Sequence, residues 1–259
     1  MKNASIMNDA VMNQRTERGL LVWLLLTGWF GVLMGLPWTL AVLRDNASTG
    51  WWWEAAGDLL FFIPASSAVG VWLGKKVGLG FELRELVSGT PGCWKHVRLA
   101  LVPGTLVGLT LGILQLISQN VIPKDALVPE LNNPNTFEWL LRCLSAALTE
   151  EIAFRFGLMS LFVWVIRALV KRPAFHAPSL WIGNLLSALV FAAAHFPQLE
   201  LQRYGLSLFV PFVVSSSGVG MIMGWLYMRY GLVSAIAAHL VTDLMIYVIP
   251  RWVPVISVP

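Results

Sequence analysis

The chain has 259 residues, of which 57% are hydrophobic and only 12% are charged, and its mean hydropathy is +0.69. Soluble domains carry about 25% charged residues, so this composition excludes an ordinary water-soluble protein. It predicts an all-α fold, a polytopic membrane helical bundle. The net charge of +4 does not indicate a nucleic-acid partner, because the basic residues stand in short loops. In such loops they indicate orientation and contacts with the phospholipids of the bilayer.

Seven stretches of the chain are apolar and long enough to cross a bilayer, which takes about 20 residues. The stretches are 20–43, 58–77, 99–122, 137–170, 180–196, 206–228 and 232–249. The fourth stretch is too long for one straight crossing, so it is either one tilted helix or two segments. We therefore predict seven to eight transmembrane helices. No change of composition divides the chain, so we expect a single integral membrane domain over residues 1–259.

Lysine and arginine alternate along the connections between these stretches. They are frequent before the first stretch and in the second and fourth connections, and sparse in the others. The positive-inside rule then places the N-terminus in the cytoplasm, with residues 1–18 as a short tail. The small size and the short loops favour a prokaryotic plasma membrane.

The fourth stretch carries three charges within six residues, those of Glu150, Glu151 and Arg155. Each such charge at the centre of a membrane helix costs roughly 2.5–3.5 kcal/mol on insertion scales, so the cluster needs a reason. Glu151 and Arg155 are i,i+4 neighbours and can pair, whereas Glu150 is turned about 100° away. We expect one glutamate to be held by the arginine and the other to be free to act. The alternative is a buried ion-pair cluster that only fixes helix packing.

Two histidines lie inside apolar stretches, His195 in the fifth and His239 in the last, where Asp243 follows four residues later. A desolvated glutamate suits general acid–base chemistry, and a histidine beside it can position a water molecule. A second histidine can donate to the oxyanion that forms when water attacks an amide. Alternatively, two histidines and carboxylates can bind zinc, which activates the same water. These residue types therefore leave open both hydrolysis and proton or ion transport.

Three smaller features lead to expectations about packing and the interface. Gly218, Gly220 and Gly224 in the sixth stretch predict a face for close helix packing. Asp58 is expected at the membrane interface, with a place facing a cavity as the alternative. Arg142 is expected to extend outward to the interface or to meet a carboxylate.

The order of the polar motifs resembles the CPBP family, which contains the type II CAAX prenyl endopeptidases and the bacteriocin-processing Abi proteins. Glu-Glu-x-x-x-Arg, Phe-x-x-x-His and His-x-x-x-Asn/Asp each stand in a separate stretch. We take residues 137–249 as the catalytic core of that family. The resemblance implies an intramembrane endopeptidase that cleaves a membrane-associated or lipidated peptide or protein, with no nucleic-acid partner. A non-catalytic bacteriocin-immunity or scaffold protein of the same fold is the alternative, as is a zinc-dependent version of the hydrolysis.

The resemblance implies six catalytic residues, which are Glu150, Glu151, Arg155, His195, His239 and Asp243. Glu150 would be the base that activates water, with the help of His195. Glu151 and Arg155 would orient the site, and His239 would face the oxyanion together with residue 243. His195 stands late in its stretch, whereas His239 stands early in another. For the two histidines to lie at the same depth in the membrane, either the fifth helix must begin inside the cytoplasm or the last helix must be offset or broken.

Residue 243 departs from the pattern of the prenyl proteases, which have asparagine at this position. An amide donates a hydrogen bond to an oxyanion, whereas an ionised carboxylate repels it. We therefore expect Asp243 either to be protonated or to orient His239. A carboxylate here also makes a zinc site of His195, His239 and Asp243 conceivable, and zinc is the one cofactor that the pattern allows.

Overall fold

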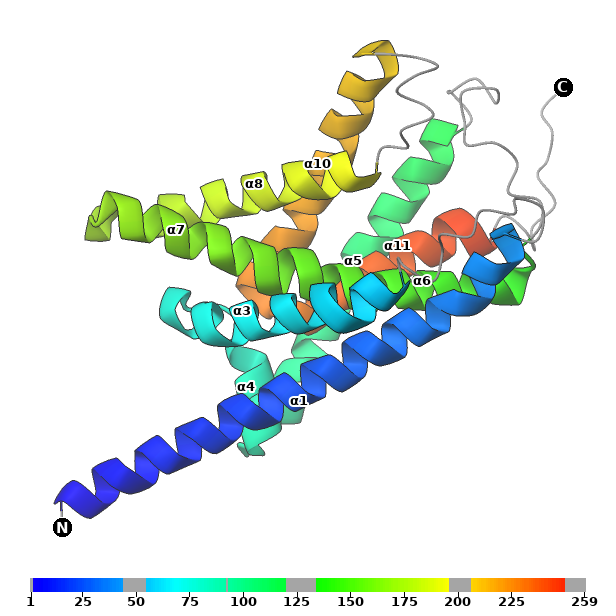
Figure 1. Ribbon diagram of the computed structural model, residues 1–259. Coiled ribbons are helices and arrows are strands. Elements are labelled where there is room, and N and C mark those ends of the chain that lie inside the picture. The colour runs from blue at the N-terminus through cyan, green and yellow to red at the C-terminus, as the bar shows by residue number, and fades with distance from the viewer. Residues whose placement is uncertain (1, 44–54, 92, 120–133, 196–205, 250–259) are drawn as a thin grey trace, which may run out of the picture.

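The computed structural model describes residues 2–43, 55–91, 93–119, 134–195 and 206–249 (Figure 1). Every element within these ranges is a helix, which confirms the predicted all-α fold. The helices of the first half are α1 (Lys2–Leu43), α3 (Ile63–Val77), α4 (Phe81–Ser88) and α5 (Cys93–Gln119). Those of the second half are α6 (Thr136–Glu150), α7 (Ser160–Val170), α8 (His176–His195), α10 (Leu206–Tyr230) and α11 (Leu232–Asp243).

Wider or tighter helical turns join or extend several of these helices. The π-helical turns are η1 (Asp58–Phe62) before α3, η3 (Glu151–Met159) between α6 and α7, and η5 (Leu244–Val248) after α11. A short 3₁₀ turn, η4 (Pro173–Phe175), leads into α8. Because π-turns are rare and often stand at functional sites, the nine-residue η3 marks the middle of the fourth stretch as unusual.

Five helices of the described ranges are long and apolar enough to cross a membrane. They are Gln14–Ala41, Ala55–Val77, Val97–Leu114, Thr136–Val170 and Pro173–His195, and Leu232–Val248 is a shorter apolar helix. Large apolar side chains lie exposed along them, among them Phe61, Leu109 and Leu169. Such an exposed apolar surface fits lipid rather than water, so the fold is that of an integral membrane protein.

The fourth stretch is one continuous helix of 35 residues, not two segments. It begins with a capping box, in which the Asn135 side chain accepts a hydrogen bond from the Glu138 backbone N–H at 3.0 Å. The Glu138 carboxylate accepts in return from the Asn135 backbone N–H at 2.7 Å. Both groups satisfy backbone donors that the first turn of a helix leaves free.

The most extensive contacts between helices are those of α11 with α5, α1 with α6 and α10 with α8 (Figure 1). The predicted glycine face of α10 is confirmed at Gly220 and Gly224. A Cβ on Gly220 would stand 3.0 Å from the Cβ of Ala188 in α8, and the Asn184 side chain of α8 lies against Gly224. Gly218 has no such neighbour within 4 Å, so it contributes nothing to this packing.

The largest apolar cluster extends from Val32 of α1 past η3 toward the end of the bundle at which α1 begins. Its buried members come from α1, α3, α4, η3, α7, α10, α11 and the connection before α4, and they include Leu20, Leu24, Ile63, Phe156, Met159, Val163, Tyr227 and Leu232. Since these side chains are closely packed, they close that end of the bundle below the charged residues of the fourth stretch.

The turn between α10 and α11 sets the depth of the last helix. Gly231 has φ +95°, a conformation that favours glycine, and the Glu82 carboxylate of α4 accepts the backbone N–H of Leu232. At 1.5 Å per residue, His239 lies about 10 Å from the start of α11, whereas His195 lies about 28 Å from the start of α8. Because both imidazoles lie within 3.7 Å of the Glu150 carboxylate, α8 and α11 begin at different depths along the bundle.

Candidate active site

Glu151 is the buried anchor of the charged cluster. Its side chain has no exposed surface, and its Oε2 lies 3.2 Å from Nε of Arg155. Its other oxygen, Oε1, lies 2.7 Å from Nδ1 of His239 in α11. The predicted pairing of Glu151 with Arg155 is therefore confirmed, and the same carboxylate also holds a histidine that sequence spacing did not assign to it.

Arg155 ties three helices together. Its Nη2 donates to the Gly220 carbonyl oxygen of α10 at 3.2 Å, and its Cζ stands 4.6 Å from the centre of the Phe191 ring of α8. With Glu151 on its own helix, the guanidinium has a counter-charge, a carbonyl and an aromatic face as neighbours. It is buried as a packing element and is not open to a ligand.

Glu150 differs from its neighbour because it faces a cavity, with 14% of its side chain exposed. Its Oε2 lies 3.1 Å from Nε2 of His195 and 3.7 Å from Nε2 of His239. Its Oε1 lies 3.4 Å from Nη2 of Arg142. Helices α6, α8 and α11 thus bring one carboxylate and two imidazoles together, and the glutamate that Arg155 does not hold is the accessible one.

His195 is oriented by its own helix. Its Nδ1 lies 2.7 Å from the Phe191 carbonyl oxygen, which can only accept, so Nδ1 carries a hydrogen and donates it. In the neutral ring Nε2 is then an acceptor, and the short contact with Glu150 requires one proton between the two groups. This pair can therefore take up a proton and pass it on.

His239 is surrounded by carboxylates. Glu151 accepts from Nδ1, while Nε2 lies 3.5 Å from Oδ2 of Asp243 and 3.7 Å from Oε2 of Glu150. In its protonated form the ring directs an Nε2–H toward the space beside Glu150. Asp243 thus stands next to His239, as the i,i+4 spacing predicted, and can orient its ring.

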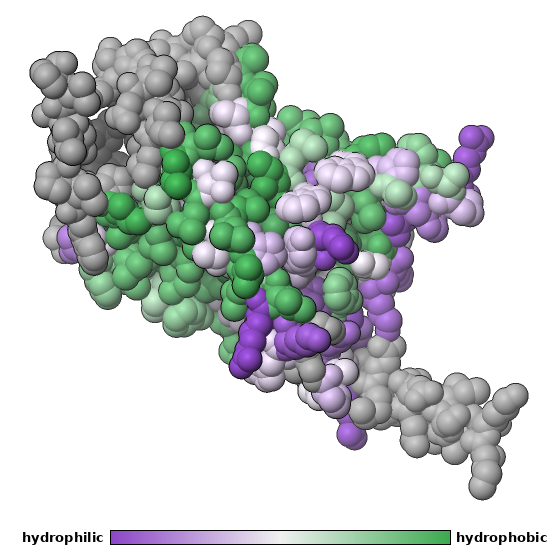
Figure 2. Space-filling view, turned by 180° about the vertical axis from the view of Figure 1, so that it is seen from behind, coloured by the Kyte–Doolittle hydropathy of each residue, from purple (hydrophilic) through white to green (hydrophobic). Residues whose placement is uncertain are grey.

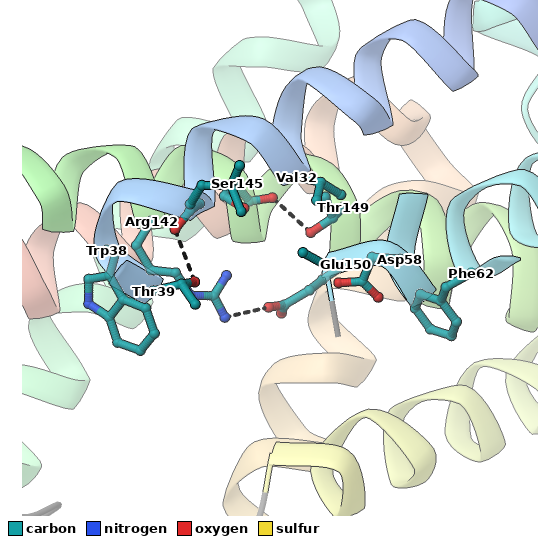
Figure 3. A pocket seen from close by; sticks show the side chains of 12 residues that line it. Val32, Trp38, Thr39, Asp58, Phe62, Arg142, Ser145, Thr149 and Glu150 are labelled. Atoms are coloured by element: carbon teal, nitrogen blue, oxygen red, sulfur yellow. Dashed lines mark hydrogen bonds and ion pairs between the residues drawn. The ribbon is translucent and has the colours of Figure 1, made fainter. Parts of the chain in front are cut away.

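A cavity of about 240 Å³ reaches Glu150 from between α1, α6 and the segment 55–62, which includes η1. Figure 3 shows Arg142 and Glu150 directed toward one another, with Trp38 beside Arg142 and with Asp58 and Phe62 on the side of Glu150. Asp58 therefore faces the cavity. Of the two positions expected for it, this is the second, rather than a position at the membrane interface alone. Arg142 meets a carboxylate, and its Cζ stands 5.6 Å from the centre of the Trp38 ring.

Sequence spacing did not select Arg142 or Trp38 as parts of the site. The signal for Arg142 is its separation from Glu150 by eight residues, which is about 2.2 turns and so leaves both on neighbouring faces of α6. For Trp38 no local signal exists, because its position depends on the packing of α1 against α6.

The donor set does not support a zinc site. In the ranges that the structure describes, no three His, Cys, Asp or Glu side chains are grouped so that they could hold a metal ion. The metal-dependent alternative therefore has no support from this geometry.

Residues 132–245 match the family described as type II CAAX prenyl endopeptidase Rce1-like. No curated protein and no solved structure matches the chain. The matched residues contain Glu150, Glu151, Arg155, His195, His239 and Asp243, which contact one another in the fold, with Glu150 at the wall of the cavity. The chain therefore carries, at residues 132–245, a domain of the Rce1-like type II CAAX prenyl endopeptidase (CPBP) family.

Proposed function

We propose that the protein is an intramembrane endopeptidase that hydrolyses a peptide bond of a membrane-associated or lipidated peptide or protein. The observation that carries this proposal is the position of Glu150, whose Oε2 lies within 3.7 Å of two imidazole nitrogens at the wall of a cavity. The protease family of residues 132–245 supports it. A carboxylate with these partners is suited to take a proton from water and to return it later.

In this mechanism a water molecule stands between Glu150 Oε2 and the carbonyl carbon of the substrate. The water oxygen bonds to that carbon while Glu150 takes one of its protons, and His195 holds the carboxylate in place. The carbonyl oxygen becomes an oxyanion. The bond between carbon and nitrogen then breaks, and the leaving amine receives the proton from Glu150, so that the base is restored without a covalent intermediate.

We propose that His239 stabilises the oxyanion. In its protonated form the ring donates a hydrogen bond from Nε2 to the negatively charged oxygen. A preorganised donor at the place where charge develops is worth roughly 2.7–4 kcal/mol of the barrier. Asp243, at 3.5 Å from the same nitrogen, orients the ring and balances its charge. In this scheme Glu151 and Arg155 position His239 and do not touch the substrate.

We further propose that residues 1–259 form a single membrane domain with its catalytic core at residues 137–249. In this arrangement α10 and the helix Leu232–Val248 are the sixth and seventh spans, after the five long apolar helices. The N-terminal residues 1–18 would then lie on the cytoplasmic side of a prokaryotic plasma membrane.

The test is cleavage by purified protein with Glu150→Gln as the key variant. Glutamine keeps the shape but cannot take a proton, so we expect turnover to fall by at least a hundredfold. The probes are a fluorogenic apolar peptide and the same peptide with a prenylated cysteine, both presented in detergent micelles. Glu138→Gln is the matched control, because glutamine also serves at this position of a capping box, and it should keep full turnover.

Unchanged turnover in a folded Glu150→Gln protein would contradict the proposed mechanism. If neither probe is cleaved, and the biological effect of the protein survives alanine at both Glu150 and His195, the non-catalytic immunity or scaffold function replaces it.

A further inference from the structure

Arg142 is a charged residue of α6 within an apolar span. An ionisable side chain in such a span is costly, and Arg142 lies inside the candidate span Thr136–Val170. Figure 2 shows hydrophobic residues over the middle of the bundle and hydrophilic residues gathered toward the end where α1 begins. Arg142 lies away from that end, because its neighbour Trp38 belongs to the last third of α1. Its charge therefore needs a reason in the interior of the bundle.

The guanidinium of Arg142 contacts one oxygen of the proposed base. Its Nη2 lies 3.4 Å from Oε1 of Glu150, eight residues further along the same helix (Figure 3). The other oxygen, Oε2, is the one that lies 3.1 Å from Nε2 of His195 and 3.7 Å from Nε2 of His239. Because each oxygen has its own partners, the carboxylate cannot turn without losing one of these contacts. Arg142 thus decides which oxygen remains for the histidines.

An aromatic group holds Arg142 in place. The Trp38 ring of α1 lies under the guanidinium, with its centre 5.6 Å from Cζ, and an arginine is attracted to the face of such a ring. The same ring meets Trp139 of α6 edge to face, with 5.4 Å between the centroids. Trp139 in turn stacks on Tyr247 of η5 at 4.9 Å. The arginine therefore rests on a ring from α1 that α6 and η5 support.

Two glycines of α1 set the position of Trp38 along α6. A Cβ on Gly31 would stand 2.9 Å from the Thr149 side chain, and a Cβ on Gly35 would stand 2.7 Å from Oγ of Ser145. Because these atoms are absent, α1 and α6 approach closely at this level. Trp38 follows Gly35 by three residues, which is about one turn. The helix that carries Trp38 precedes the matched family domain, so a part of the chain outside that domain supports the proposed base.

We propose that Arg142, held by Trp38 of the first helix, is a positioning residue for the hydrolysis, which fixes Oε1 of Glu150 so that Oε2 faces the histidines and the attacking water. This inference rests on the proposed function for the words hydrolysis and attacking water. Arg142 itself exchanges no proton, because a guanidinium stays charged in proteins. It keeps the accepting oxygen aimed at the water, and such alignment accounts for much of the rate of an enzyme.

The first test is the effect of Arg142→Gln on the cleavage of the two peptide probes by the full-length protein in detergent. We expect kcat to fall by roughly tenfold or more, since the base is no longer aimed. KM should stay within about twofold, because an interaction that only positions the base does not bind the substrate. Arg229→Gln is the matched control, as its exposed guanidinium also lies on an aromatic ring, 5.7 Å from the centre of Tyr230, and it should keep both constants.

Rescue separates positioning from a merely structural role. Arg142→Lys keeps the charge but not the planar fork of donors, so it should recover part of kcat. In Arg142→Ala, guanidinium chloride added at concentrations that do not unfold the protein should restore kcat as its concentration rises. The added ion can reach this place, because Arg142 lines the cavity and 34% of its side chain is exposed.

Nitrogen-15 NMR of the histidine rings measures the same arrangement without turnover. In Arg142→Gln the ring signals of His195 and His239 should shift, because both face Oε2 of Glu150. The signals of His176, which is exposed at the start of α8, should stay. Arg229→Gln should shift the signals of none of these three rings.

Unchanged kcat in Arg142→Gln would overturn the proposal, and so would unchanged signals of His195 and His239. A higher KM with the kcat of the unsubstituted protein would overturn it too, and would make Arg142 a group that binds the substrate. A loss of kcat that neither lysine nor guanidinium relieves would reduce Arg142 to a structural residue. Failure of the hydrolase mechanism is seen elsewhere, as full turnover of Glu150→Gln, and leaves the shifts of the two ring signals intact.

Discussion

Glu150 and Glu151 are neighbours in the chain but have opposite surroundings. Glu151 has no exposed surface and faces Arg155 and His239, whereas Glu150 lies at the wall of a cavity beside Arg142, whose side chain is 34% exposed. A buried charge that loses its partner is far less stable than one that water can reach. The two glutamates should therefore differ in what their removal does to the fold.

Glu151→Ala should destabilise the protein by about 3–5 kcal/mol, because it leaves the Arg155 guanidinium buried without a counter-charge. Glu150→Ala should change the stability by about 1 kcal/mol or less, since its ion pair with Arg142 is partly solvated. Thermal and denaturant unfolding in a mild detergent measures both. Equal losses from the two substitutions would contradict the division into an anchoring and a reacting carboxylate.

At the scale of single residues, the sequence was sufficient to select polar groups that contact one another in the fold, but not the residues that line the cavity beside them. The spacing of Glu151 and Arg155 and the presence of His195 and His239 inside apolar stretches identify groups that must find partners away from lipid. Which carboxylate each histidine meets depends on the rotation of α8 and α11. That rotation is decided by packing such as Asn184 against Gly224, which no local pattern contains.

At the scale of elements, the π-helical η3 was not predictable from the hydrophobic pattern. In a π-turn a backbone carbonyl loses its usual partner four residues later, so other groups can bond to it. Ser187 of α8 donates to the Phe154 carbonyl at 2.6 Å, which joins α8 to η3 one turn away from the glutamates. The local geometry that positions His195 against Glu150 therefore depends on a helix irregularity and on a serine of another helix.

The start of α11 depends on one carboxylate of α4. Glu82 is 3% exposed, and its Oε1 accepts the Leu232 backbone N–H, while its Oε2 has no hydrogen-bond partner in the ranges that the structure describes. Burial raises the pKa of the Glu82 carboxyl from its ordinary value of 4.5 to about 7, against the opposing effect of the Leu232 hydrogen bond and of Arg84. Glu85 of α4 adds to the rise, and Tyr227 of α10 also faces this carboxyl.

Since the pKa is higher in the folded protein than in the unfolded chain, the protonated carboxyl favours the fold. This contribution, on the order of 3 kcal/mol, is complete below about pH 4.5 and is lost as the pH rises through 7. We expect the melting temperature of the detergent-solubilised protein to fall between pH 5 and pH 8. In Glu82→Gln, which cannot ionise, most of this fall should disappear, and an identical pH profile of both proteins would refute the assignment.

At the scale of the whole molecule, composition alone was enough for an all-α membrane protein, because nothing else accounts for so few charges in 259 residues. The offset of the last helix was not predictable. It arises where Gly231 turns the chain and Glu82 caps α11, two residues that are about 150 positions apart and share no motif. Hydrophobic length gives the number of crossings but not the relative depth at which each begins.

The pairing of Glu151 with Arg155 inside one helix also bears on how the protein is made. A chain is synthesised from its N-terminus, so Thr136–Val170 meets the membrane long before α11 exists. At that stage His239 is absent, but the guanidinium four residues further on already neutralises the carboxylate that will be buried deepest. Arg142 lies beside Glu150 in the same segment in the same way, so both glutamates can enter lipid with a partner on their own helix, and the imidazoles arrive with the later helices.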